Sequence, residues 1–226
     1  ACFEGKLLVA LTVDEREKKY NLALFNIGGV AQLSLSKTLP PPEQKRISDL
    51  KCHDNGCLAV VGGKVFRTDN LKTWKDLKVP ATPEITLNTV DTKTNPFSGW
   101  QEKLLLSKGI FTRAELLPSG DVAVLDPLRT TIVSIGPKGT TRWGKWGAWE
   151  GNLMSPKDIV FMGTELFAVS DPGLKVITIF DSVGNYQGTV GVDNEILEPK
   201  HGIHITHLNN TLYVADLLGD KVYGLE

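Results

Sequence analysis

The chain has 226 residues, with 25 basic and 26 acidic side chains and a formal net charge of −1. This length fits one larger all-β domain, so we expect residues 1–226 to form a single domain. The balanced charge argues against a nucleic-acid-binding protein, because such proteins concentrate Lys and Arg. All apolar runs are shorter than the roughly 20 residues of a membrane-spanning helix, so the sequence predicts no membrane span.

The first third of the chain is a series of short runs with the periodicity of strands. Residues 6–37 contain three runs in which apolar and polar residues alternate, which is the period of a strand with one buried face. A proline-rich connector at 38–43 lacks backbone donors and ends this unit. Residues 47–78 contain four more short runs, which predict a second antiparallel unit.

Cys52 and Cys57 flank the turn sequence His-Asp-Asn-Gly between two of these runs. Cross-strand neighbours in a hairpin lie close enough for a disulfide after local adjustment. Two small buried hydrophobic residues are the alternative. We predict a Cys52–Cys57 disulfide in the oxidised protein, with Cys2 outside it, and such a bond favours a secreted or otherwise extracytosolic location.

Residues 67–74, with the sequence RTDNLKTW, resemble the Asp-box of sialidase-type propellers. Asp69, Thr73 and Trp74 match that pattern, whereas Arg67 and Leu71 stand where it has a hydroxyl residue and a glycine. The resemblance implies a braced hairpin in which the aspartate accepts turn amides and the tryptophan packs between sheets. It implies no catalytic role.

A regular repeat begins after residues 79–110. Three copies of one unit follow, at 111–147, 155–191 and 198–226. In each copy a short apolar run ends in an aspartate, a turn follows and a β-branched run begins. These aspartates are spaced 45 residues apart, and they are Asp126, Asp171 and Asp216.

A period of 40–50 residues made of four short strands is typical of a β-propeller. We therefore predict an all-β propeller with four-stranded antiparallel blades. The number of blades is five or six, because 79–110 is either a degenerate blade or an enlarged connection. The last copy ends after its third strand, so we expect another part of the chain, the N-terminal residues, to complete it.

Residues 155–226 are similar to NHL-type propeller repeats through the segments SPKDIVF, LFAVSD and LKVITIFD. This resemblance implies a fold and leaves the function open, because propellers of this pattern include scaffolds, ligand-binding modules and enzymes.

The last unit, which begins HGIHITHLNN, is also similar to one blade of the paraoxonase and SMP-30-type calcium-dependent hydrolases. In those enzymes the asparagine of an Asn-Gly-Ile sequence faces the central channel and binds calcium. The resemblance places His201 at that position, with Asp158 and Arg113 at the matching positions of the other repeats. Imidazole is a poor ligand for Ca²⁺ and an arginine repels it, so we expect no bound metal. Calcium belongs only to a hydrolase interpretation.

The candidate ligand-binding residues share the channel face of the predicted propeller, and they are Arg113, Asp158, His201, Arg129, Lys175 and Trp149. The first three begin innermost strands, so we expect them to approach one another, and they either pair among themselves or bind a ligand. An exposed indole such as that of Trp149 either anchors a partner or packs into the core. The repeated aspartates are expected to accept amides of their own turns.

His204 and His207 extend a His-x-x-His-x-x-His sequence from His201. Side chains alternate faces along a strand, so a spacing of three points His204 away from His201, and we expect no metal site from this trio. No nucleophile elbow, phosphate loop or zinc-protease motif is present. The sequence therefore favours a binding or protein-interaction module whose channel face takes a protein or a small polar ligand. The alternative is a calcium-dependent hydrolase or lactonase of the paraoxonase/SMP-30 type with an altered metal site.

Overall fold

The structure is a computed structural model, and it describes residues 2–3, 6–14, 19–28, 33–53, 56–79, 111–117, 119–137, 139–163, 165–191, 203–216 and 221–225. These residues form strands β1 to β19, joined by turns and short connectors. Within these ranges there is no helix long and apolar enough to span a membrane. The all-β prediction is confirmed.

The strands form five sheets, or blades, and each blade uses consecutive strands in antiparallel pairs. Blade 1 consists of β1 (Cys2–Phe3), β2 (Lys6–Asp14), β3 (Lys19–Ile27) and β4 (Leu33–Leu39). Blade 2 consists of β5 (Ile47–His53), β6 (Gly56–Val61), β7 (Lys64–Thr68) and β8 (Lys75–Asp76).

The three sequence repeats correspond to the other three blades. Blade 3 consists of β9 (Arg113–Leu116), β10 (Val122–Asp126), β11 (Thr131–Gly136) and β12 (Gly139–Trp143). Blade 4 consists of β13 (Asp158–Phe161), β14 (Leu166–Asp171), β15 (Val176–Asp181) and β16 (Tyr186–Val190). Blade 5 consists of β17 (Ile203–Leu208), β18 (Thr211–Asp216) and β19 (Lys221–Leu225).

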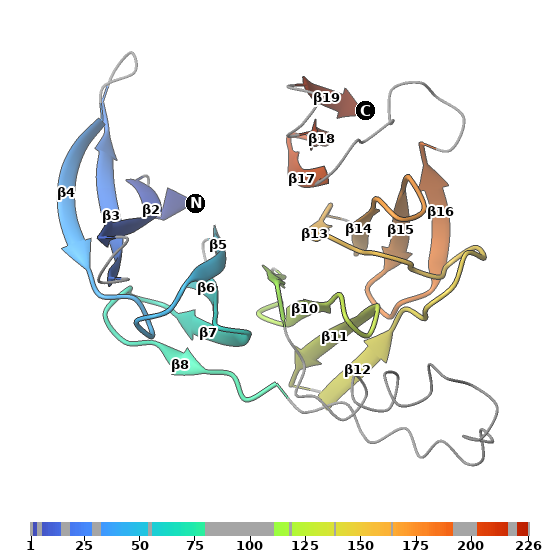
Figure 1. Cartoon of the computed structure of the whole chain (residues 1–226), viewed down its shortest axis with the longest axis horizontal. Coiled ribbons are helices and arrows are strands. Elements are labelled where there is room, and N and C mark those ends of the chain that lie inside the picture. The colour runs from blue at the N-terminus through green and yellow to red at the C-terminus, as the bar shows by residue number, and fades with distance from the viewer. Residues whose placement is uncertain are drawn as a thin grey trace.

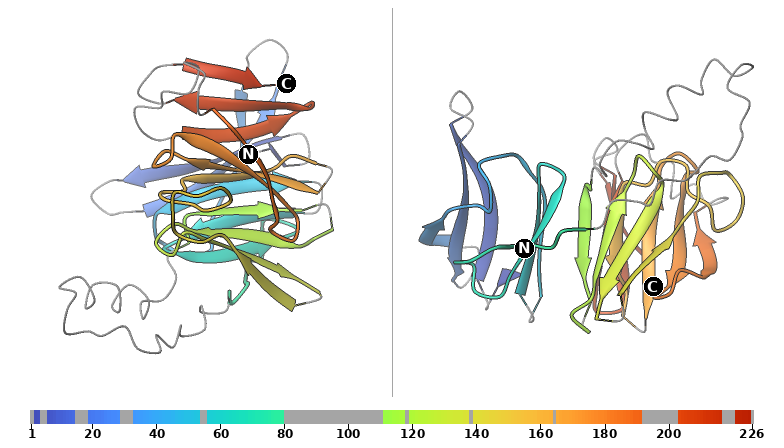
Figure 2. Two further views of the ribbon diagram at one scale, coloured as in Figure 1. Left: turned by 90° about the vertical axis from the view of Figure 1, so that its right-hand side faces the viewer. Right: turned by 90° about the horizontal axis from the view of Figure 1, so that it is seen from below.

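The five blades are arranged around a common centre (Figure 1). Their first strands follow one another there, because β1 lies against β5, β5 against β9, β9 against β13 and β13 against β17. The strands of all blades run between the same two faces of the molecule (Figure 2). No further blade separates β5 from β9, so the described residues form five blades. Residues 80–110, which left the number open, lie outside the described residues.

The expected closure of the ring is wrong for the described residues. Blade 5 has three strands, and the N-terminal strand β1 pairs with β2 inside blade 1 instead of completing blade 5. Blade 1, in blue, and blade 5, in red, are the first and last blades around the centre, and no described strand lies between them (Figure 1). The reason is local: β1 is only two residues long and precedes β2 by two positions in the chain, so its backbone groups pair with the neighbouring strand.

Each pair of adjacent blades shares an apolar cluster. The largest, between blades 3 and 4, surrounds Trp143, whose ring lies 5.7 Å from that of Phe167 and 5.0 Å from that of Phe180. Both phenylalanines are almost completely buried, and each contributes about 2–3 kcal/mol through burial. Similar clusters lie between blades 2 and 3 and between blades 4 and 5. The second strands, such as β6, are buried on both faces because they pack against two neighbouring blades.

The repeated aspartates brace the turns that follow the second strands. Asp171 accepts the amides of Gly173 at 3.0 Å and Leu174 at 3.3 Å. Asp126 accepts the amide of Arg129 at 3.3 Å. The prediction that these carboxylates hold their own turns is confirmed for both residues. Asp216 is also buried, and the turn after it lies outside the described residues.

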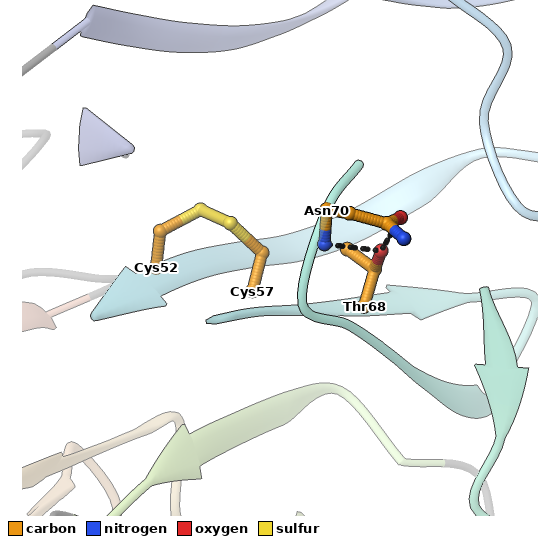
Figure 3. The surroundings of a disulfide bond; sticks show 4 residues. All are labelled: Cys52, Cys57, Thr68 and Asn70. Atoms are coloured by element: carbon orange, nitrogen blue, oxygen red, sulfur yellow. Dashed lines mark hydrogen bonds between the residues drawn. A yellow bond between two sulfur atoms is a disulfide. The ribbon is translucent and has the colours of Figure 1, made fainter. Parts of the chain in front are cut away.

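Cys52 and Cys57 form the predicted disulfide (Figure 3). They lie directly opposite each other in the β5–β6 ladder, with their Cα atoms 4.1 Å apart. The bond therefore joins the first two strands of blade 2 at the end where β5 stops.

The Asp-box expectation needs one correction. The turn after β7 is braced by Asn70, whose Oδ1 accepts the amides of Lys72 at 2.8 Å and Thr73 at 3.0 Å. Asp69 is exposed and pairs with Arg67 instead. The amide group of Asn70 lies next to Thr68 in Figure 3, and it takes the bracing role because it is one residue closer to the amides that need an acceptor. Trp74 packs into the clusters around β6, as expected.

Candidate functional site

Four blades place a polar residue at the same point near the start of the innermost strand. The strand register defines this point, because each residue pairs with the position one before the end of the second strand. The pairs are Asp49 with Val60, Arg113 with Leu125, Asp158 with Ser170, and His204 with Ala215. The four equivalent residues are called the channel ring below.

The channel ring surrounds one cavity of about 330 Å³. All four ring residues line it, together with Ser48 and the apolar side chains of Ala10, Ile47 and Leu50. The cavity lies where β5, β9 and β13 begin. The ring residues are up to 155 positions apart in the chain. They come together because each lies at the same point of an innermost strand.

Arg113 connects three blades. Its Nη1 donates to the backbone carbonyl of Ser48 in blade 2 at 2.7 Å and to that of Thr112 at 3.0 Å. Its Nε lies 3.4 Å from Oδ1 of Asp158 in blade 4. The guanidinium thus joins blade 3 to blades 2 and 4. The expected approach of Arg113 to Asp158 is present in the structure.

Asp158 is 4% exposed and joins blade 4 to blade 5. Its carboxylate accepts the amides of Ile159 at 2.9 Å and Ile205 at 3.2 Å. Burial alone would raise the pKa of Asp158, but the hydrogen bond from His204 and the charges of Lys51 and Arg113 outweigh it and hold that pKa below the ordinary value of 3.8.

His204 approaches both charged neighbours through one ring nitrogen. Its Nδ1 lies 3.2 Å from Oδ2 of Asp158 and 3.3 Å from Nη2 of Arg113. A protonated Nδ1 donates to the carboxylate, whereas an unprotonated Nδ1 accepts from the guanidinium, so the tautomer decides which partner is favoured. Nε2 has no hydrogen-bond partner among the described residues, and the side chain of His204 is 40% exposed at the cavity.

Asp49 occupies the equivalent position in blade 2 but has a different charge environment. Its oxygens accept the amides of Leu50 and Ala114, each at 3.0 Å. Burial raises the pKa of Asp49, and the nearby charge of Lys51 only partly opposes this shift. The same strand position therefore holds one carboxyl that ionises readily and one that does so reluctantly.

A second layer lies two residues further along the innermost strands. Lys51 of β5 forms an ion pair with Glu115 of β9, with Nζ 2.7 Å from Oε2. The same Nζ donates to the backbone carbonyl of Ile159 in β13, also at 2.7 Å. Burial would lower the pKa of Lys51, but the charges of Glu115, Asp158 and Asp49 raise it above 10.5. This layer therefore joins the first strands of blades 2, 3 and 4 through one ammonium group.

The structure corrects the position expected for the last blade. The residue equivalent to Arg113 and Asp158 in the strand register is His204. The sequence pattern predicted His201 there and placed His204 on the opposite face of the strand. Arg113 and Asp158 each lie 13 residues before the strand-end aspartate, and the same count from Asp216 reaches Ile203, next to His204. The count from the aspartate therefore misses His204 by one position, and only the strand register identifies it. His201 itself lies outside the described residues.

Sequence reasoning also missed Asp49, although the run ISDLKC begins an innermost strand just as the matching runs of blades 3 and 4 do. The other candidates lie away from the described lining of the cavity. Arg129 is almost buried and its Nη1 pairs with Oδ2 of Asp126 at 2.7 Å. Lys175 is exposed at the end of its turn, and Trp149, 83% exposed, lies in the connector before blade 4.

The calcium implied by the hydrolase resemblance does not fit the channel ring. Ca²⁺ takes six to eight oxygen ligands, whereas here the guanidinium of Arg113 lies against Asp158 and backbone amides occupy the carboxylate oxygens. In the described part of the chain, His, Cys, Asp and Glu form no group of three or more that could hold a metal ion.

No known protein family matches the chain, and no curated protein resembles it closely in sequence. Solved structures do resemble it in fold. They include a catalytically inactive virginiamycin B lyase from Staphylococcus aureus with quinupristin, at a TM-score of 0.57 and 12% identity, covering 100% of this chain and 68% of that one.

Two further structures give a similar result. A streptogramin B lyase has a TM-score of 0.55 and 9% identity, covering 91% of this chain and 61% of that one. A putative 6-phosphogluconolactonase from Bacteroides uniformis has a TM-score of 0.52 and 11% identity, covering 97% and 67%. The chain thus spans about three fifths to two thirds of the length of these proteins. Identities this low show the fold alone, which defines the chain as a β-propeller.

Proposed function

We propose that the chain is a ligand-binding β-propeller whose channel cavity takes a small polar ligand. The observation that carries this proposal is the channel ring: four consecutive blades place Asp49, Arg113, Asp158 and His204 at equivalent points around one cavity of about 330 Å³. Pockets at the centre of a fold, with a few convergent polar groups in an apolar wall, are the usual form of a small-molecule site.

The unused hydrogen-bonding capacity of the ring determines the chemistry of the ligand. Arg113 and Asp158 mainly hold the blades and orient His204, whose Nε2 is available at the cavity. Asp49 supplies the second polar wall, with a carboxyl whose pKa is raised by burial. A ligand that donates to one of these groups and accepts from the other fits, such as a polyol, a hydroxy acid or a lactone.

The test is a binding panel of four small probes: erythritol, lactate, ethanolamine and glucono-δ-lactone. We expect at least one polyol, hydroxy acid or lactone to shift the ring resonances of His204 in NMR spectra and to raise the thermal midpoint. The variant His204→Gln should lose both effects, and His207→Gln, on the same strand but outside the described cavity lining, should keep them. A panel that gives no His204-dependent shift would contradict the proposal.

A second candidate function is an acid–base reaction in the same cavity. The specific observation is the 3.2 Å contact between Asp158 and Nδ1 of His204, because a carboxylate that orients an imidazole leaves the other ring nitrogen free to act as a base. The similar structures include lyases and a putative lactonase, and the catalytically inactive lyase among them carries an alanine in place of a histidine. This version of the enzyme hypothesis uses no calcium.

Glucono-δ-lactone distinguishes the two candidates. A binding module leaves its spontaneous hydrolysis rate unchanged, whereas an enzyme accelerates it and loses the acceleration in His204→Gln. Acceleration that appears only after Ca²⁺ is added would instead support the calcium-dependent hydrolase. The Cys52–Cys57 disulfide supports an extracytosolic setting as part of the proposal, and exposed indoles such as Trp149 support a protein-binding role for the rim.

A further inference from the structure

A second cavity of about 740 Å³ lies between blades 3 and 4. Leu117, Phe161 and the turns that follow β9 and β13 line it, whereas the channel cavity lies where those strands begin. The two cavities therefore lie toward opposite faces of the propeller. The volume is in the range of small-molecule pockets.

Asp121, in the turn between β9 and β10, places a carboxylate in the wall of this cavity, where the described lining holds no cationic side chain. Oδ1 of its carboxylate is enclosed by protein and has no hydrogen-bond partner among the described residues. The carboxylate lies on the backbone of Gly136, where an added Cβ would overlap it. The glycine thus makes room for a carboxylate whose enclosed oxygen has no partner in the described part of the chain. An unpaired buried polar atom is costly and indicates a missing partner.

Glu165 adds a second negative charge at the rim. It is exposed in the turn between β13 and β14, at a φ of 65°. The described lining contains no Lys, Arg or His. Two carboxylates without a described counter-charge attract a cationic group, and they repel an anionic one.

Part of the lining of the cavity is apolar. Phe161 is half-buried, its ring lies 5.4 Å from that of Phe167, and Leu117 is almost buried. Such a wall accepts hydrocarbon or an aromatic ring. We propose that this cavity binds a small organic cation, with its ammonium group at Asp121 and Glu165 and its apolar body against Phe161 and Leu117.

The test uses three probes of matched shape in isothermal titration calorimetry at low salt: 2-phenylethylamine, 2-phenylethanol and phenylacetate. We expect the amine to bind at least about tenfold more tightly than the alcohol, since a charge-assisted hydrogen bond is lost in the alcohol. Phenylacetate should not bind. Affinity for the amine should fall as salt rises.

Variants assign the effect to the cavity. Asp121→Asn should weaken amine binding by about tenfold, and Glu165→Gln should weaken it by a smaller factor because that side chain is exposed. Glu150→Gln, which removes an exposed carboxylate outside the described lining, is the matched control and should change nothing. His204→Gln should also leave amine binding intact, so failure of the channel proposal would not affect this one.

Three results would overturn the inference: no amine binding, equal binding of amine and alcohol, or full amine affinity in Asp121→Asn. Should that variant fold poorly by circular dichroism, Gly136→Ala provides the second route, because its Cβ displaces the carboxylate. Undiminished binding in a folded Gly136→Ala protein would be equally decisive against the site.

Discussion

Asp49 and Asp158 occupy equivalent positions on β5 and β13, yet their pKa values move in opposite directions. Asp158 is buried and Asp49 is half-buried, and both accept an amide from the next blade. The difference is that Asp158 also has the imidazole of His204 and the guanidinium of Arg113 within 3.4 Å. Charge neighbours therefore decide which carboxyl of the ring carries a stable negative charge.

The first prediction concerns the pH dependence of stability in Asp158→Asn. A carboxyl whose folded pKa lies below 3.8 contributes stability above the unfolded pKa and loses it as the pH falls through the folded value. We expect the variant to be about 3 kcal/mol less stable than wild type at pH 7, because the guanidinium loses its partner. The difference should shrink below about pH 4. Urea unfolding at pH 7, 5 and 3.5 measures it.

Asp49→Asn is the matched control for this prediction. Its folded pKa is raised, so its contribution is complete below the unfolded pKa and is lost as the pH rises through the folded value. The cost of Asp49→Asn should therefore fall with rising pH, opposite to that of Asp158→Asn. Equal pH slopes for the two variants would show that the charge neighbours do not set these pKa values.

At the scale of elements, the turns between the second and third strands share a strained position. Thr130 and Lys175 each lie four residues after the strand-end aspartate and have positive φ angles of 49° and 60°. Non-glycine residues rarely adopt this conformation, at a cost of about 1–2 kcal/mol. The bracing carboxylates Asp126 and Asp171 hold the turns in this shape.

The second prediction is that Lys175→Gly is more stable than Lys175→Ala by about 1 kcal/mol, since glycine relieves the strain that alanine keeps. Lys157, which is exposed and has no positive φ angle, serves as the comparison site. There the order should reverse, because glycine only adds freedom to the unfolded chain. Thermal melts of the four variants provide the measurement, and the same order at both sites would refute the argument.

Sequence patterns at this scale predicted elements better than side-chain roles. The 45-residue spacing of Asp126, Asp171 and Asp216 located three blades because every copy must bury the same faces. The disulfide could be predicted because the two cysteines flank a short turn, so the hairpin itself brings them together. The choice of Asn70 over Asp69 as the turn brace could not be predicted, because it depends on which side chain reaches the free amides.

At the scale of the whole molecule, the channel ring depends on contacts between blades that sequence periodicity does not encode. Periodicity alone could not place Asp49 against Ala114, or His204 against Arg113 and Asp158, because those contacts cross from one blade to another. For the same reason, periodicity could not give the number of blades or predict that blade 5 has only three strands among the described residues. Both features depend on which blades contact each other, whereas a sequence repeat specifies only the strands within one blade.

Lys51 of blade 2 contacts two other blades through one atom. Its Nζ pairs with Glu115 in blade 3 and donates to the backbone carbonyl of Ile159 in blade 4. Glu115 is only 2% exposed, so removing the lysine takes the cation of this ion pair away from a buried carboxylate. Breaking one side of a buried ion pair costs more than replacing both partners with apolar groups.

The last prediction is therefore a comparison of Lys51→Met with Lys51→Met/Glu115→Leu. We expect the single variant to lose about 3–5 kcal/mol of unfolding free energy and the double variant to recover most of that loss. In the single variant, amide hydrogen exchange should accelerate in β5, β9 and β13 together, since all three strands meet at the Nζ. Lys64→Met is the control: it removes an exposed ion pair with Glu43 and should leave exchange in those strands unchanged. A double variant no more stable than the single one would show that Lys51 acts through packing, because only an uncompensated charge is relieved by removing the carboxylate.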